Sequence, residues 1–231
     1  MKILTVGDTH GSNVTPYLTT VIDKYDKVVC VGDYTDSFEY GDKEILFALN
    51  SLIELKKKYP DKLILLLGNH DLQYMFPHSQ HRCSGYRPMA YPQYHDVFEK
   101  NKELFQFAYQ EKNYLWTHAG VNKKWYKDRF NKFVEMYPDL TLAQQLNLAF
   151  KAYASQLFIV GFSRGGNERW GGPVWTGKEE MIYIPLANMN QIVGHTKVRK
   201  IEEYDFDGYK VVFVDTLQSL PINKAFYELE I

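Results

Sequence analysis

Short apolar runs, each ended by a glycine or a polar residue, recur along the chain. They are brief, rich in Leu or β-branched residues, and typical of buried strands. The six runs are KILTVGD (2–8), KVVCVGD (27–33), KLILLLGN (62–69), NYLWTHAG (113–120), NQIVGHT (190–196) and YKVVFVDT (209–216). Because open α/β sheets place ligands at the carboxyl ends of their strands, we expect the chemistry to converge where these runs end.

Segments with helical spacing separate the predicted strands. Residues 43–59 carry Ile45, Leu46, Leu49, Leu52 and Ile53 and stop before Pro60. Residues 92–109 and 122–137 are also expected to be helical. A further helix is expected to begin at Thr141, with Gln144 three residues on in the pattern of a capping box. We therefore predict one α/β domain over residues 1–231, with the long helical stretch of 92–160 forming part of an inserted cap at about 72–180.

The composition narrows the classes of protein. The 231 residues carry 27 basic and 28 acidic side chains, a formal charge of -1, so nucleic acid is not expected as an obligate partner. The apolar stretch at the start is too short for a signal peptide, and the longest apolar run is far below membrane-spanning length. With only Cys30 and Cys83, a disulfide framework is not expected. We expect a globular protein of the cytoplasm that does not act at membranes.

Residues 161–177, GFSRGGNERWGGPVWTG, hold six glycines around two arginines and two tryptophans. So many glycines exclude a regular helix. Two interpretations stay open: a surface loop pinned by its tryptophans, or a mobile loop that brings Arg164 and Arg169 toward a bound anion.

Carboxylate, amide and imidazole groups gather at the predicted strand ends. They are Asp8, His10, Asp33, Asp36, Asn69, His70, His118 and His195. One strand-end Asp or His is usually a turn former or a helix cap, but a whole set would repel or stay poorly solvated unless cations lie among them. Oxygen and nitrogen donors without thiolates suit divalent ions such as Mn, Fe, Zn or Co. His78, His81 and His95 fall outside the strand ends, and we expect ordinary surface or supporting roles for them.

In order, the motifs are G-D-T-H-G, G-D-Y-T-D, G-N-H-D, H-A-G and G-H-T. This series resembles the calcineurin-like metallophosphoesterase superfamily, and within it the small bacterial and phage relatives of the PPP-type serine/threonine phosphatases. The resemblance covers the chain from Asp8 to His195, although between about 72 and 180 it rests on H-A-G and, loosely, on G-G-P-V-W.

The resemblance implies a four-layer α/β/β/α sandwich that holds two divalent metal ions, for which Mn is preferred among Mn, Fe, Zn, Co and Ni. Asp8, His10 and Asp33 would bind the first ion, and Asp33, Asn69, His118 and His195 the second. His70 would be the general acid, oriented by Asp36. Asp71 would have a structural or supporting role.

Two positions depart from the PPP-type pattern. The family reads G-D-x-x-D-R-G and R-G-N-H-E, and both arginines grip the substrate phosphate, whereas this chain has Ser37 and Leu67 in those places. Neither residue can imitate the bidentate guanidinium fork. The substitute clamp is expected from one or more of Arg82, Arg87, Arg164 and Arg169.

These features predict a hydrolase of phosphoric esters or anhydrides, foremost a phosphomonoesterase of the protein phosphatase type. Its substrate would be a phosphoprotein, a nucleotide or a small phosphoester. A symmetrical dinucleoside tetraphosphatase stays open because PVWTGKEE loosely matches that branch. A phosphodiesterase or nuclease is disfavoured because G-H-T-K lacks the second histidine of G-H-x-H. A catalytically silent interaction module is the non-enzyme alternative, disfavoured because every expected ligand is retained.

Overall fold

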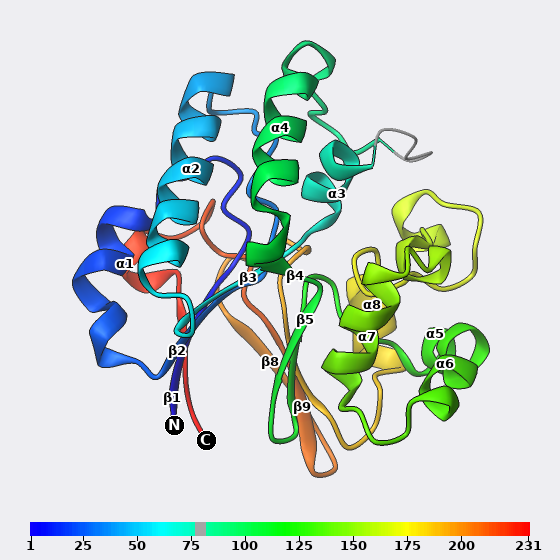
Figure 1. The fold of residues 1–231 in the computed structure, drawn as a ribbon. Coiled ribbons are helices and arrows are strands. Elements are labelled where there is room, and N and C mark those ends of the chain that lie inside the picture. Colours follow the sequence, from blue (N-terminus) through cyan, green and yellow to red (C-terminus); the bar gives the residue numbers. More distant parts are fainter. Residues whose placement is uncertain (77–81) are drawn as a thin grey trace.

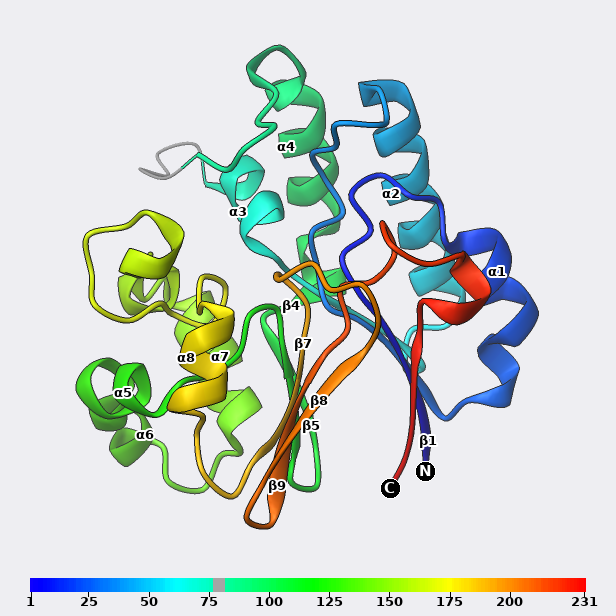
Figure 2. The same cartoon turned by 180° about the vertical axis from the view of Figure 1, so that it is seen from behind.

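Two five-stranded sheets lie face to face, with helices on both outer sides (Figures 1 and 2). The computed structural model describes residues 1–76 and 82–231. The predicted α/β class and its four-layer arrangement are confirmed. His78 and His81 lie outside the described residues.

The first sheet has the order β10-β1-β2-β3-β4. Its strands are β1 (Lys2–Val6), β2 (Lys27–Cys30), β3 (Leu63–Leu66), β4 (Phe105–Gln106) and β10 (Tyr227–Glu230). The first four are parallel, and β10 runs antiparallel to β1. The carboxyl ends of β1, β2 and β3 therefore meet at one edge.

The second sheet has the order β5-β6-β7-β9-β8. Its strands are β5 (Ala108–Glu111), β6 (Tyr114–Thr117), β7 (Asn190–Val193), β8 (Glu202–Phe206) and β9 (Tyr209–Phe213). Because β6, β7 and β9 are parallel, the residues that follow them share an edge as well. All six predicted strands are present. β4, β5, β8 and β10 were not anticipated.

Alternation along the strands divides the core between the layers. Val29 and Val31 pack between the two sheets, whereas Val28 and Cys30 face the helices, as the period of two in a strand requires. One buried hydrogen bond joins the sheets directly, from Trp116 Nε1 to Thr5 Oγ1 at 2.9 Å.

Helices α1 (Thr15–Val21), α2 (Asp42–Lys58), α3 (Asn69–Met75) and α4 (Tyr91–Asn101) lie outside the first sheet (Figure 1). Helices α5 (Lys123–Trp125), α6 (Asn131–Met136), α7 (Leu142–Lys151) and α8 (Lys178–Tyr183) lie outside the second. A π-helical turn, Tyr126–Phe130, joins α5 to α6. Short 3₁₀ turns are Ile22–Lys24, Pro88–Ala90, Lys102–Leu104, Ser155–Phe158, Phe162–Arg164 and Ile222–Lys224.

The helix predictions have mixed outcomes. Residues 43–59 and 122–137 are largely helical, and the capping box is formed, with Gln144 N donating to Thr141 Oγ1 at 3.3 Å. The helix over 92–109 is wrong beyond Asn101, because Phe105–Gln106 pairs with β3 and Ala108–Glu111 with β6. The expected helical stretch of 92–160 is therefore interrupted by β4, β5 and β6. The segment 72–180 contributes to all four layers, and a covering role over the site stays a prediction.

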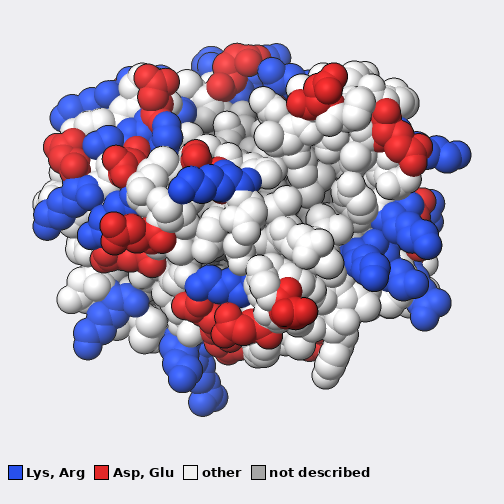
Figure 3. Space-filling view, turned by 90° about the horizontal axis from the view of Figure 1, so that it is seen from below, with Lys and Arg blue, Asp and Glu red and all other residues white. Residues whose placement is uncertain are grey.

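Among the described residues, no helix has the length and apolar character needed to cross a membrane. On the face seen from below, basic and acidic side chains lie intermingled (Figure 3). That face offers no broad field of one sign, which agrees with the near-neutral formal charge of -1.

Candidate metal centre

The residues after β1, β2 and β7 adopt an unusual backbone conformation. His10, Asp33, Asp36 and His195 have φ of 42°, 54°, 56° and 62°, in the left-handed region that side chains with a Cβ rarely adopt. Such strain persists only where the surroundings over-determine it, and it concentrates at functional sites. Here the left-handed residues are four of the predicted site residues, and they lie in the loops at the carboxyl ends of strands from both sheets.

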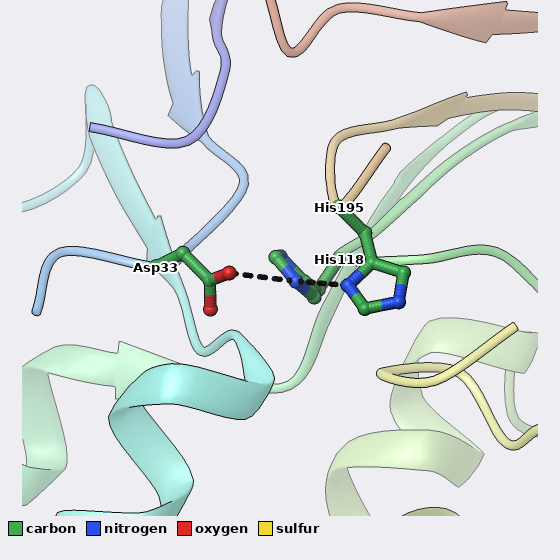
Figure 4. A group of neighbouring side chains, drawn as sticks. All are labelled: Asp33, His118 and His195. Atoms are coloured by element: carbon green, nitrogen blue, oxygen red, sulfur yellow. Dashed lines mark hydrogen bonds and ion pairs between the residues drawn. The ribbon is translucent and has the colours of Figure 1, made fainter. Parts of the chain in front are cut away.

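Asp33 lies at the centre of the cluster, buried at the end of the β2 segment. Its Oδ2 is 3.8 Å from His10 Nε2 and 3.3 Å from His118 Nε2. Figure 4 shows the Asp33 carboxylate facing His118, with the ring of His195 beside it. These three side chains follow different strands, so the site exists only because the two sheets pack together.

Two imidazoles are held through Nδ1, the ring nitrogen that lies away from Asp33. His10 Nδ1 lies 3.1 Å from the carbonyl oxygen of Thr35, and His118 Nδ1 lies 2.9 Å from that of Val31. A carbonyl oxygen only accepts, so each Nδ1 carries a proton and each Nε2 is left with a free lone pair facing Asp33. Outer hydrogen bonds that set the tautomer in this way are typical of metal-binding histidines.

Asn69, His195 and Asp8 complete the cluster. Asn69 donates through Nδ2 to Cys83 Sγ at 3.2 Å, which turns its Oδ1 to within 2.8 Å of His118 Nε2. His195 Nδ1 lies 3.2 Å from the same nitrogen. The backbone N–H of His195 donates to Asp8 Oδ2 at 2.8 Å and so joins the ends of the two sheets.

Two groups of possible ligands share one carboxylate. Asp8, His10 and Asp33 form one group and Asp33, His118 and His195 the other, with the ligand atoms of each group within 4.8 Å of one another. Asp8 Oδ1 is buried without a hydrogen-bond partner. Burial, Asp215 and Asp33 raise the pKa of Asp8 well above its usual range. Clustered oxygen and nitrogen donors of this kind, with one carboxylate oxygen left without a hydrogen-bond partner, fit a pair of divalent cations around Asp33.

Two glycines of the motifs allow this close packing. A Cβ at Gly68 would lie 2.0 Å from Asp33 Oδ1, and one at Gly194 would lie 2.0 Å from Asp8 Oδ1. Both distances are impossible for real atoms, so only glycine lets the two carboxylates occupy these places. The glycines of G-N-H-D and G-H-T are therefore part of the site.

The partly exposed His70 and the buried Asp36 form a pair next to Asp33. His70 Nδ1 lies 2.8 Å from Asp36 Oδ2, and Asp36 also accepts hydrogen bonds from Gln73 Nε2 and Tyr74 Oη. Burial works to lower the pKa of His70, but the charges of Asp33 and Asp36 outweigh it and raise the pKa to about 9. The imidazole is thus held in one orientation and kept protonated near neutral pH.

Asp71 holds the turn at Asp33. Its carboxylate accepts from the backbone N–H groups of Asp33 at 2.8 Å, Gly68 at 3.0 Å and Tyr34 at 2.9 Å. Burial and the nearby Asp33 raise the pKa of Asp71 to about 6. This residue therefore braces the strained backbone that presents Asp33.

The four candidate arginines have different surroundings. Arg164 is half-buried and donates to Thr196 Oγ1, next to His195. Burial lowers the pKa of Arg164, while nearby carboxylates, Asp8 among them, act in the opposite direction. Arg169 instead stacks on Trp170 at 5.0 Å. Arg82 donates to the carbonyl of Gln73 at 2.9 Å and stacks on Tyr86 at 4.4 Å.

Arg87 has a structural role. Its Nη1 donates to Asp42 Oδ1 at 2.9 Å, and its Nη2 donates to the carbonyl oxygens of Ser37 at 2.5 Å and Tyr40 at 2.8 Å. A guanidinium with three such partners is committed to the loop between Asp36 and α2.

The glycine-rich segment is pinned in place. Trp170 and Trp175 pack against the main core. The buried carboxylate of Glu180 accepts from Gly171 N at 3.0 Å, Ser163 Oγ at 2.8 Å and Asn122 Nδ2 at 2.9 Å. These contacts favour the interpretation as a pinned loop, and they fix where Arg164 is presented.

The sequence reasoning missed Asp215 and Cys83. Asp215 follows β9, lies buried, and has an Oδ1 without a partner. Burial raises its pKa to about 6, although the charge of His10 acts in the opposite direction. Asp215 follows the apolar run of a predicted strand, in FVDT, and the same pattern of an acidic residue at a strand end marked Asp8 and Asp33. No local signal marks Cys83, because its contact with Asn69 depends on the tertiary fold.

Comparison with known proteins identifies the class. The profile of the calcineurin-like phosphoesterase family matches residues 1–199, so the chain belongs to that family. It is a metal-dependent phosphoesterase of the hydrolase class, and family members typically use divalent metals and act on phosphorylated substrates. Among curated proteins, none matches this sequence.

Solved structures of phosphatases resemble this chain. The cold-active protein-tyrosine phosphatase of a psychrophilic Shewanella species has a TM-score of 0.59 at 17% identity, over 99% of this chain and 75% of that one. A protein serine/threonine phosphatase from Saccharomyces cerevisiae has a TM-score of 0.48 at 17% identity, over 92% of this chain and 67% of that one. At 17% identity, the first similarity shows a shared fold.

Proposed function

We propose that this protein is a phosphomonoesterase of the small PPP-like type, active with two divalent cations and best with Mn²⁺. One observation supports it above all: two ligand groups share Asp33, and the His70–Asp36 pair lies directly beside them. In this proposal Asp8, His10 and Asp33 hold one cation, and Asp33, Asn69, His118 and His195 hold the other. When bound, the cations supply charge neutralisation at the phosphoryl oxygens and a water of lowered pKa.

Other residues of the chain would donate a proton, orient the proton donor and bind the phosphate. His70 gives the proton on Nε2 to the leaving oxygen, because its Nδ1 is engaged by Asp36 Oδ2 at 2.8 Å. Asp36 keeps the ring in place throughout. Arg164 binds a nonbridging phosphoryl oxygen in place of the arginines that Ser37 and Leu67 replace, because it is the candidate that contacts the G-H-T turn.

The hollow beside the proton donor His70 favours a monoester. The hollow that includes His10 and His70 has a volume of about 150 Å³. Pockets that enclose drug-sized ligands span roughly 300–1,000 Å³. A phosphorylated side chain fits such a hollow better than a dinucleoside tetraphosphate does.

A panel of substrates tests this function. Metal-loaded protein is assayed on a phosphopeptide, an aryl phosphate monoester, the matching diester and diadenosine tetraphosphate. We expect hydrolysis of the monoesters to be fastest. Activity confined to the diester would contradict the proposed branch, and activity confined to diadenosine tetraphosphate would assign the protein to the dinucleoside tetraphosphatases.

A further inference from the structure

The loop between Asp36 and α2 presents an aromatic side chain beside the proton donor. Phe38 lines the same hollow as His10, His70 and Ser84, and it is the one apolar side chain among the described residues of that wall. The Phe38 side chain is 85% exposed. Single exposed apolar residues are common on protein surfaces. What distinguishes Phe38 is its position in the wall that also holds His70.

This loop is built to hold its shape. Arg87 Nη2 donates to the carbonyl oxygens of Ser37 and Tyr40, on both sides of Phe38. Ser37 Oγ accepts from the backbone N–H of Glu39 at 3.1 Å and of Tyr40 at 3.2 Å. The backbone around Phe38 is therefore fixed from two directions, so the side chain always starts from the same point at the rim of the hollow.

The tip of the Phe38 ring lies near Gly85. A Cβ added at Gly85 would lie 3.5 Å from Phe38 Cζ and 3.6 Å from Asp36 Cβ, both ordinary contact distances. Gly85 has φ of +81°, which favours glycine at this point. The remaining surface of the ring faces solvent at the rim of the hollow.

We infer that Phe38 is a recognition element for the leaving group and that the preferred substrates are aryl phosphate monoesters, such as phosphotyrosine side chains. This inference rests on the proposed function, because it takes His70 as the group that protonates the leaving oxygen. The group attached to that oxygen then has to lie in the hollow that His70 and Phe38 share. A volume of about 150 Å³ suits a single ring there. Paired aromatic rings attract each other beyond the effect of the area they bury.

Matched peptides test the inference. One sequence carries phosphotyrosine and the other phosphoserine, and kcat/KM is measured for the natural protein and for Phe38→Ala, Phe38→Leu and Phe47→Leu. Phe47 is a control on α2 that is 64% exposed outside the hollow. We expect both Phe38 variants to lose about five- to tenfold on phosphotyrosine and to change by less than about twofold on phosphoserine. The control should change neither value.

Equal losses on the two peptides, or no loss on phosphotyrosine, would overturn the inference. A binding measurement keeps it independent of turnover: calorimetry compares phenylphosphonate with methylphosphonate on metal-loaded protein. We expect the phenyl compound to bind about fivefold more tightly, and Phe38→Ala to abolish that advantage. If this preference appears although no monoester is cleaved, the proposed function and the assignment of aryl monoester substrates both fail, and only the role of Phe38 in binding an aryl group stands. If monoesters are cleaved and the preference is absent, the inference fails and the function stands.

Discussion

Individual side chains in this site are oriented by hydrogen bonds to residues that are not themselves proposed metal ligands. The strained backbone of Asp33 is held in place by Asp71, whose carboxylate accepts the N–H of Asp33 at 2.8 Å. His118 presents Nε2 because the carbonyl of Val31 engages its other nitrogen. Oriented ligands need no reorganisation when a cation binds, since their supporting contacts are already in place. Substitutions at the residue scale therefore separate catalysis from metal binding.

Replacing His70 by asparagine should remove the proton donor and keep the metal site. We expect turnover of an alkyl phosphate to fall at least about a hundredfold. The loss should be smaller on p-nitrophenyl phosphate, because its leaving group needs no proton. Steady-state kinetics and metal content by elemental analysis check both statements. Near-normal turnover of the alkyl phosphate would remove His70 from the mechanism.

Arg164 and Arg169 offer a matched pair within one glycine-rich segment. Because Arg164 contacts the turn of His195 whereas Arg169 stacks on Trp170, only Arg164→Ala should weaken phosphate binding. We expect its KM to rise about tenfold or more, the scale of a hydrogen bond to a charged group. Michaelis–Menten measurements on one monoester decide it. Unchanged kinetics in both variants would exclude the segment as the phosphate clamp.

At the scale of elements, strand ends carry the ligands and glycines set how closely they approach. The turn after β7 passes so near Asp8 that a Cβ at Gly194 would lie 2.0 Å from its carboxylate. Gly194→Ala should therefore displace His195 or Asp8 and lower metal affinity about ten- to a hundredfold. Titration with Mn²⁺ followed by calorimetry measures the change.

Gly41→Ala is the control for that substitution. A Cβ at Gly41 would meet Glu44 Oε2 at 3.5 Å, an ordinary contact that involves none of the proposed metal ligands. Its metal affinity should equal that of the natural protein. If Gly194→Ala also binds Mn²⁺ normally, then the close approach has no part in shaping the site.

Elements whose residues show a clear hydrophobic pattern could be predicted from the sequence. Elements that form only because a neighbouring strand or segment lies beside them could not. The strand before Asp33 is marked by four apolar residues and a stop at glycine. β4 is two residues long and exists because β3 lies beside it, and the preceding helical pattern hid the alternation of Phe105, Gln106 and Phe107. The approximate place of the site could be read from strand ends. The contacts of Cys83, Glu180 and Arg87 could not, because each joins segments distant in sequence.

Over the whole molecule, the site joins two sheets that otherwise meet through apolar packing and the hydrogen bond between Trp116 and Thr5. Asp8 and Asp33 come from the first sheet and His118 and His195 from the second, so a cation bound among them links both halves of the fold. Buried carboxylates crowd the same place, and Asp8 has its pKa raised by Asp215 and Asp33 as well as by burial. Cations that neutralise this charge should stabilise the folded state.

Thermal unfolding tests that coupling. A ligand that binds only the folded state at a hundred times its dissociation constant stabilises it by about 2.7 kcal/mol. For a chain of this size that corresponds to about 5–10 °C in Tm. We expect Mn²⁺ to raise the Tm by this amount relative to protein treated with a chelator, and Asp33→Asn to abolish most of the rise. An equal rise in the variant would show that the stabilising ions bind elsewhere.

Anomalous diffraction from crystals grown with Mn²⁺ tests the central claim most directly. The account predicts two peaks that both contact the Asp33 carboxylate. One should contact Asp8 and His10, and the other Asn69, His118 and His195. A single peak, or peaks that do not contact Asp33, would contradict it.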